Sequence, residues 1–269
     1  MRTNARISCG LCISVIVAGA TLPVMAQTKA DALQLAELTS LKGKVGSADT
    51  RTRVDATHRV WSIGVTNGPS DVKLAALALL LEPVDSASDH IRMPAIYAIA
   101  EIAGTSADVA VKEAALNALA APLRSEQMPA RNAATDAVNG IVRSGRTSEL
   151  APAALRVLAP AVGSGTNGVR MPAINAVVRA VEGSQNAAAY NTALDLLLGP
   201  LGSNAITGGM EVRMMAIVAV ERIGVDAQDV VTKAKAMGLA QSYVTRSSWE
   251  AEARKRASDA ASAIQRTLK

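Results

Sequence analysis

Apolar and polar positions follow one another along most of this chain with the period of an amphipathic helix. Counted from Arg92, apolar side chains stand at offsets of 3, 4, 6, 7, 10 and 11 residues, which places them on one face of an α-helix. The same frame returns after five further arginines: Arg53, Arg131, Arg170, Arg213 and Arg254. The phrase Arg-Met-Pro-Ala-Ile even occurs twice, at 92–96 and 170–174. The pattern predicts a series of helices that each bury one apolar face.

The six arginines are separated by 39, 39, 39, 43 and 41 residues, and a regular period of this size is typical of a solenoid. A second apolar-periodic segment precedes each arginine-led segment, and four of these finish near a proline: Pro83, Pro122, Pro160 and Pro200. A proline at that place bends or ends a helix. We therefore predict helical hairpins that start near residues 28, 69, 107, 148, 186 and 227 and stack to share one core.

The repeated phrase places Pro94 and Pro172 two residues after an arginine. We expect both prolines in the first turn of a helix, where a missing N–H costs nothing because that amide has no intrahelical acceptor. Arg92 and Arg170 are then predicted to be structural, bridging neighbouring units or capping carbonyl groups.

The phrases Val169-Arg170, Glu211-Val212-Arg213 and Ile91-Arg92 resemble the second-helix opening of the HEAT repeat family, whose first helices are bent by proline. The resemblance covers almost all of residues 27–269 and implies an all-α, right-handed α-solenoid of about six hairpins. The family usually places an aspartate in the inter-helix turn, paired with an arginine of a neighbouring unit. Here Asp85 or Asp89 fits that role, so we do not expect a continuous Asp/Arg ladder.

The first residues have the pattern of a secretory signal. Arg2 and Arg6 precede an apolar run over 7–22, and Val24-Met25-Ala26 offers a cleavage site. We predict that residues 1–26 are a signal peptide and that 27–269 form the repeat domain, although a retained membrane anchor is the alternative. Cys9 and Cys12 lie inside the signal, so the mature chain would contain no cysteine and no disulfide. Since the chain has no Asn-X-Ser/Thr sequon, a bacterial periplasm is the favoured location.

Composition narrows the classes of function. The mature balance would be 28 − 2 = 26 basic against 23 acidic residues, or +3, which is too mild to indicate a nucleic-acid partner. With no Phe, two Trp and three Tyr in the chain, the core is expected to consist of Ala, Leu, Val and Ile on closely packed helices.

Catalytic and cofactor motifs are weak. Gly163-x-Gly165-x-x-Gly168 matches a dinucleotide fingerprint, but that motif needs a preceding strand, whereas 151–161 has a helical pattern, so we expect a turn. His58 and His90 are the two histidines of the chain, and no carboxylates cluster at ligand spacing. We therefore predict no metal, no cofactor and no enzyme activity.

A binding surface is expected opposite the apolar face of the arginine-led helices, at offsets 1, 5, 8 and 12. The HEAT resemblance implies that these helices line the concave surface. The candidate partner-binding stripe comprises His58, Trp61, Met93, Tyr97, Asp136, Asn139, Met171 and Asn175. Aromatic and Met side chains of this kind anchor protein interfaces. Alternatively, Trp61 plugs the open end of the solenoid against Leu35 and Leu38.

The resulting hypothesis is a periplasmic protein-binding scaffold. Two alternatives stay open. One is an enzyme or enzyme-maturation factor, because HEAT-like repeats occur in phycobilisome lyase-type proteins. The other is a peripheral envelope protein whose basic C-terminal segment, 249–256 followed by Arg266 and Lys269, binds anionic lipid.

Overall fold

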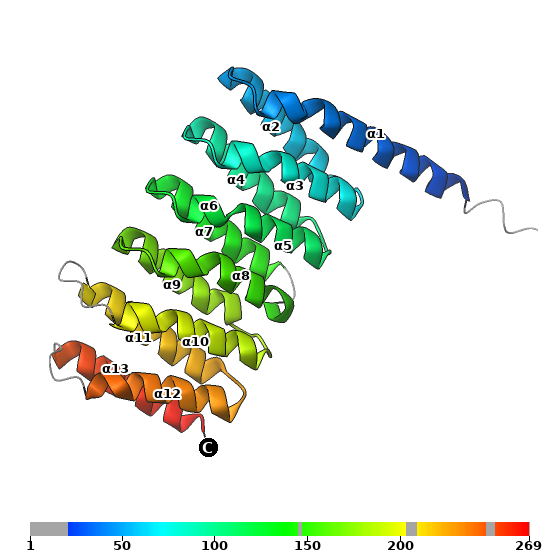
Figure 1. Ribbon diagram of the computed structural model, residues 1–269. Helices are drawn as coiled ribbons and strands as arrows, with labels where there is room; N and C mark the ends of the chain where they lie inside the picture. The colour runs from blue at the N-terminus through cyan, green and yellow to red at the C-terminus, as the bar shows by residue number, and fades with distance from the viewer. Residues whose placement is uncertain (1–20, 145–146, 203–208, 246–250, 269) are drawn as a thin grey trace, which may run out of the picture.

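The computed structural model describes residues 21–144, 147–202, 209–245 and 251–268, which contain thirteen α-helices and no strand. The helices form two layers (Figure 1). The first layer holds the helices that precede the arginine-led segments: α1 (Thr21–Val45), α3 (Ser70–Val84), α5 (Val109–Ala118) continued by the short α6 (Ala120–Leu123), α8 (Thr147–Val162), α10 (Ala187–Gly202) and α12 (Val230–Val244).

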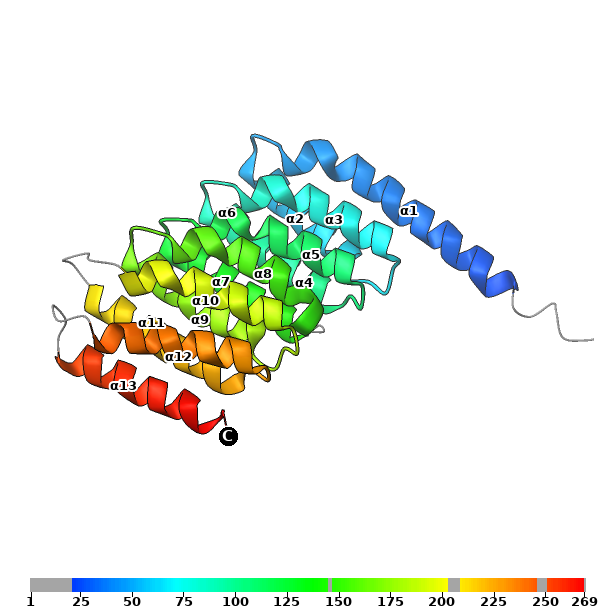
Figure 2. The same cartoon turned by 60° about the horizontal axis from the view of Figure 1, so that its bottom comes forward.

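The second layer, called here the arginine-led layer, holds α2 (Thr50–Gly64), α4 (Asp89–Gly104), α7 (Met128–Arg143), α9 (Asn167–Val181), α11 (Gly209–Asp226) and α13 (Ala251–Arg266). Each helix packs against its hairpin partner and against the equivalent helix of the next unit. Figures 1 and 2 show the hairpins stacked side by side in chain order, from α1/α2 to α12/α13. The predicted all-α solenoid is confirmed.

One continuous hydrophobic core runs between the two layers. The residue seven positions after each of the six arginines is buried in every unit: Val60, Ile99, Val138, Val177, Val220 and Ala261. Four prolines lie near the ends of the first-layer helices α3, α6, α8 and α10, and these helices run one to two residues past them. Small and aliphatic side chains make up most of this core, and among the described residues Tyr190 and Tyr243 are its two buried aromatic residues.

The prediction for Pro94 and Pro172 was wrong by one turn. Helices α4 and α9 begin at Asp89 and Asn167, so each proline is the sixth helical residue. The polar connector already adopts helical hydrogen bonding, because the amide of Arg92 donates to the carbonyl of Ser88 at 2.9 Å. Pro94 therefore removes an interior backbone hydrogen bond rather than an unused donor. Pro129, by contrast, does lie in the first turn of its helix, α7.

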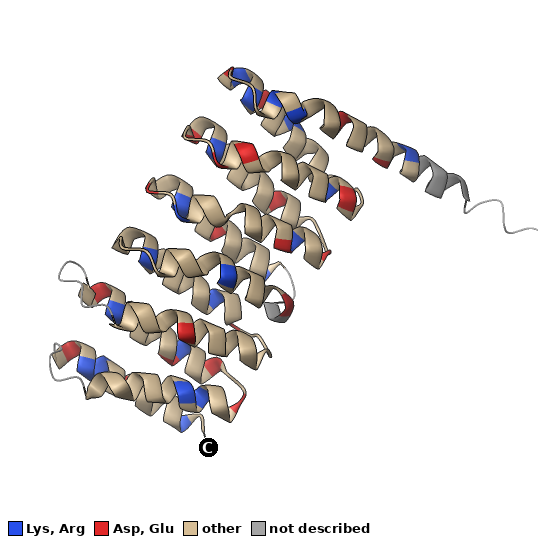
Figure 3. Cartoon of the chain, viewed as in Figure 1, with Lys and Arg blue, Asp and Glu red and all other residues tan. Residues whose placement is uncertain are grey.

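The arginines at the head of the arginine-led helices cap carbonyl groups of the inter-helix turns, as predicted. Arg92 donates to the carbonyl of Ala87 at 3.0 Å, Arg131 to that of Ser125 at 2.9 Å, and Arg170 to that of Ser164 at 2.8 Å. Figure 3 shows basic residues recurring at this end of successive hairpins, while most of the ribbon is uncharged. Backbone oxygens thus replace most of the carboxylates of an Asp/Arg ladder; Asp89 lies 3.7 Å from Arg92.

Lysines of the first layer cap the opposite helix ends, a feature that the sequence patterns did not suggest. Lys112 donates to the carbonyl of Ser144 at 2.7 Å, just past α7, and Lys233 to that of Thr267 at 2.9 Å, just past α13. Lys73 reaches Thr105 Oγ1 at 2.8 Å. Burial lowers the pKa of Lys73 and of Lys112. Cations at helix C-termini are favoured by the helix dipole, which offsets part of that desolvation.

The signal-peptide prediction falls mostly on residues 1–20, which lie outside the described residues. Residues 21–26 begin α1, so cleavage after Ala26 would leave Gln27–Val45 of this helix. None of the helices in the described ranges combines the length and the apolar character needed to cross a bilayer.

Candidate functional site

The outer face of the arginine-led layer is defined by the side chains five and eight residues after each arginine. At offset five, His58, Tyr97, Asp136 and Asn175 are exposed, as expected, and Tyr97 is 59% accessible. At offset eight, five of the six side chains are half-buried or buried, namely Trp61, Ala100, Asn139, Val178 and Glu221, while Ser262 in the last unit is exposed. The outer face therefore has an exposed row beside a recessed row.

A pocket of about 240 Å3 opens on this face between α2 and α4. Its lining includes His58 and Trp61 from α2, and Pro94, Tyr97 and Glu101 from α4. The rings of His58 and Trp61 meet edge to face, with centroids 6.2 Å apart. The structure thus brings together three of the predicted stripe residues, His58, Trp61 and Tyr97, in what we call the N-terminal pocket.

Trp61 lies at the boundary between the first two units. Its indole N–H donates to Glu101 Oε2 at 2.9 Å, and its ring packs partly against the core. The tryptophan therefore combines a structural contact with a place in the pocket wall. Glu101 was not among the predicted stripe residues, because it lies at offset nine.

Met93 and Met171 were expected on the binding stripe, but both are half-buried and pack against the hydrophobic core. They stand at offset one, near the start of their helices. Neither lines the N-terminal pocket. Part of each flexible thioether side chain stays accessible beside the core, so their contact with a partner stays a prediction.

Asn139 was also expected to be exposed and is instead 7% accessible. Its Oδ1 has no hydrogen-bond partner among the described residues. The equivalent positions in the units on either side hold the apolar residues Ala100 and Val178. A buried amide oxygen without a donor is unfavourable for the folded chain.

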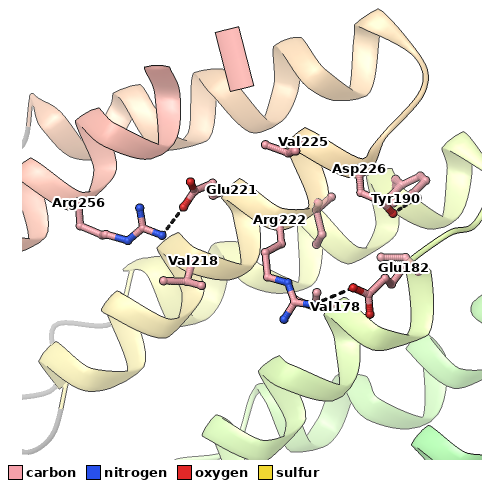
Figure 4. A pocket seen from close by; sticks show the side chains of 11 residues that line it. Val178, Glu182, Tyr190, Val218, Glu221, Arg222, Val225, Asp226 and Arg256 are labelled. Carbon is pink, nitrogen blue, oxygen red and sulfur yellow. Dashed lines mark hydrogen bonds and ion pairs between the residues drawn. The ribbon is translucent and has the colours of Figure 1, made fainter. Parts of the chain in front are cut away.

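A second and larger pocket, about 410 Å3, lies on the same side of the molecule and is lined by α9, α11, α10 and α13. Figure 4 shows its residues: Val178, Glu182, Val218, Glu221, Arg222 and Arg256 among them. We call it the C-terminal pocket. The signal that would have found it is Val218, which stands at offset five, where the other units carry polar or aromatic side chains.

Charged groups in the C-terminal pocket are paired with each other. Arg222 donates to Glu182 Oε1 at 2.8 Å, and Arg256 forms an ion pair with Glu221 (Figure 4). Because Arg256 is engaged in this way, the basic C-terminal segment presents one cation fewer to the surface than its sequence suggests. Trp249 and the other residues of 246–250 lie outside the described residues.

Tyr190 closes one end of the same pocket. Its hydroxyl donates to Asp226 Oδ2 at 2.5 Å, and the amide of Gly183 donates to the same oxygen at 2.9 Å. Burial, together with the negative charge of Asp226, raises the pKa of Tyr190 well above that of a free phenol. The phenol is therefore a hydrogen-bond donor at neutral pH and is not suited to act as a general base.

Two further kinds of site considered from the sequence are a metal site and a dinucleotide-binding loop. Within the described ranges, no three His, Cys, Asp or Glu side chains are arranged to hold a metal ion. Residues 163–166 form the turn between α8 and α9, and Gly168 is the second residue of α9. The strand that a dinucleotide fingerprint requires is replaced by helix α8.

Comparison with known proteins supports the fold. No protein-family model matches the chain, and no curated protein is similar to it. Among solved structures, Cex1p is similar over 91% of this chain and 45% of its own length, with 14% identity and a TM-score of 0.57.

Two further structures extend that comparison. The archaeal HEAT-like repeats protein from Thermococcus onnurineus NA1 covers 90% of this chain and 93% of its own, with 14% identity and a TM-score of 0.49. A designed armadillo repeat protein in complex with the peptide (KR)4 covers 87% and 100%, with 21% identity and a TM-score of 0.48. The fold and the repeat together define the chain as an α-solenoid of stacked helical hairpins.

Proposed function

We propose that this protein is a binding scaffold that holds another protein along the outer face of the arginine-led layer. The observation that carries the proposal is the N-terminal pocket, in which Trp61 and Tyr97 from adjacent units line one cavity. Clustered aromatic side chains in a partly enclosed pocket are the usual anchors of protein interfaces. An exposed aromatic residue such as Tyr97 has no role in the core of this solenoid that would explain its position.

The arrangement along the face suits an extended or elongated partner. An apolar, aromatic pocket lies near one end, the C-terminal pocket lies near the other, and the units between them offer the exposed polar side chains Asp136 and Asn175. Apolar anchors supply most of the affinity of such an interface, while polar groups between them set register and specificity. The designed armadillo protein in the comparison holds a peptide; for the present chain, a protein partner is our proposal.

Site-specific photo-cross-linking tests the scaffold directly. A photoreactive phenylalanine analogue would replace Tyr97 in one variant and Asn175 in another, and cells of the source organism would be irradiated. We expect both variants to cross-link to the same protein, identified by mass spectrometry. The matched control places the analogue at Leu198, which is 48% exposed on α10 in the other layer, and should give no adduct with that protein.

Cross-linking of one partner from all three positions with equal yield would indicate non-specific proximity and would count against the proposed face. Cross-linking from Asn175 and Leu198 but not from Tyr97 would place the interface elsewhere on the solenoid.

The proposal also includes export to the periplasm by cleavage after Ala26. N-terminal sequencing of the protein recovered from a periplasmic fraction should begin at Gln27. Recovery with Met1 intact from the membrane fraction would instead favour the retained anchor.

Lipid binding through the basic end is a weaker candidate, because Arg256 is held by Glu221. Sedimentation with anionic vesicles at low and high salt separates it from the scaffold, since electrostatic binding to a lipid surface is lost at high ionic strength.

A further inference from the structure

The N-terminal pocket combines aromatic walls with a carboxylate. Trp61 and Tyr97 reach it from neighbouring helices, and Glu101 stands on the same helix as Tyr97, one turn further on. The indole N–H of Trp61 donates to Oε2 of Glu101 at 2.9 Å, which fixes the carboxylate beside the ring.

The negative charge of Glu101 is not neutralised by the protein. Among the described residues, no Lys or Arg side chain lines this pocket or pairs with Glu101. Arg59, which is close in sequence, is directed to the other side of α2, where it donates to Glu37 of α1 at 2.9 Å. The carboxylate of Glu101 therefore lies next to the rings of Trp61 and Tyr97, while the guanidinium of Arg59 pairs with Glu37 instead.

The C-terminal pocket shows the opposite solution. There the carboxylates Glu182 and Glu221 are each paired with an arginine of the protein itself, Arg222 and Arg256. The protein's own arginines therefore pair with the carboxylates of the C-terminal pocket. The carboxylate of Glu101 in the N-terminal pocket has no such pair among the described residues and is open to a cation from another molecule.

We propose that the N-terminal pocket receives a cationic side chain of the docked partner, and an arginine in preference to a lysine. This inference rests on the proposed scaffold function and specifies what its aromatic anchor site recognises. A cation over the face of Trp or Tyr is attracted by the ring quadrupole. A guanidinium can in addition stack flat on an aromatic ring while its N–H groups reach a carboxylate, which an ammonium group does less well. A purely apolar occupant would cover Glu101 without supplying a donor, which is costly.

The test uses tryptophan fluorescence of the full-length protein with Trp249→Phe, so that Trp61 is the single tryptophan. The probes are N-acetyl-arginine methylamide and its citrulline counterpart, which has nearly the same shape without the charge. We expect the arginine probe to perturb Trp61 emission with an affinity at least about fivefold higher than the citrulline probe, the ratio that one cation–π and carboxylate contact would give. The lysine and leucine analogues should be weaker than arginine.

Two variants make the assignment specific. Glu101→Gln keeps an oxygen for the Trp61 N–H and removes the charge, so the preference for arginine over citrulline should fall to about twofold or less. Tyr97→Ala should weaken the arginine probe by about fivefold. Glu82→Gln, an exposed acid on α3 in the first layer, is the matched control and should change nothing.

Equal affinities for arginine, citrulline and leucine probes would overturn the cation assignment, as would an arginine preference that survives Glu101→Gln. If either result were found and a specific partner still cross-linked to position 97, the proposed scaffold function would stand, but the partner would not insert an arginine into this pocket. Arginine selectivity without a cross-linked partner would retain the cation pocket and remove the scaffold, and binding of none of the probes would overturn the inference.

Discussion

The guanidinium of Arg92 in α4 donates a 2.8 Å hydrogen bond to Ser125 Oγ in the turn of the following hairpin. The same side chain also reaches Gln127 Oε1 of that turn and the carbonyl of Ala87 in its own turn, both at 3.0 Å. One buried arginine thus fixes two turns to each other, which is how a solenoid couples neighbouring units without a carboxylate ladder.

Arg92→Met should therefore destabilise the protein by about 2–3 kcal/mol, because it removes three hydrogen bonds that a buried side chain makes to two turns. Arg92→Lys should recover part of the loss. Urea unfolding measures the free energy of unfolding for each variant. Arg179→Met, at an exposed position of α9, is the control and should stay within about 0.5 kcal/mol of the parent. A loss below that level for Arg92→Met would contradict the coupling role.

Gly64 allows close contact between the first two units. A Cβ at this position would come within 2.5 Å of Ile102 Cδ1 and 3.0 Å of Ala76 Cβ. Gly64→Ala should cost about 1–3 kcal/mol through overpacking. Gly238→Ala, in a helix interior with no atom within 4 Å of the added Cβ, should instead stabilise by about 0.5–1 kcal/mol, because alanine is the better helix former. Thermal unfolding of the two variants should move in opposite directions.

Asn139 should be dispensable for folding. Replacing its unsatisfied amide with the similarly shaped Asn139→Leu should raise the free energy of unfolding by about 1 kcal/mol, since the cost of burying the unpartnered Oδ1 disappears. Denaturant titration would show it. A destabilisation of similar size would mean that Oδ1 has a donor in solution.

Tyr190 gives the protein a pH dependence at the alkaline end. The pKa of its phenol is raised by burial and by Asp226, so the folded chain keeps a proton that the unfolded chain releases near pH 10. This contribution to stability is fully present below the unfolded pKa and is lost as the pH rises toward the folded pKa.

Tyr190→Phe should cost about 1–2 kcal/mol at pH 8, where the bond to Asp226 is intact, and less above about pH 10. Urea unfolding of parent and variant at both pH values provides the comparison, with Tyr97→Phe as the exposed control. A gap between parent and Tyr190→Phe that widens above pH 10 would contradict the assignment.

The repeat of helices was determined by the sequence itself. A position such as offset seven is buried in every unit because the period of 3.6 residues places it on one face of its own helix, and this needs no knowledge of the neighbours. The capping role of Arg92 was also predictable, because this arginine and its equivalents in other units follow the polar turn directly in the sequence. Tyr97 and His58 were placed on the exposed side by the same local geometry.

What the tertiary structure decided depends on contacts between units. Asn139 is buried, and Met93 packs on the core, because adjacent helices cover offsets that a single helix would leave open. Pro94 lies in the second turn because the connector before it joins the helix. Glu101 meets Trp61 across 40 residues of sequence, and this distance is closed only by the stacking angle of two hairpins. Local periodicity fixes which face is buried; the packing of one unit on the next decides which exposed side chains meet to form a site.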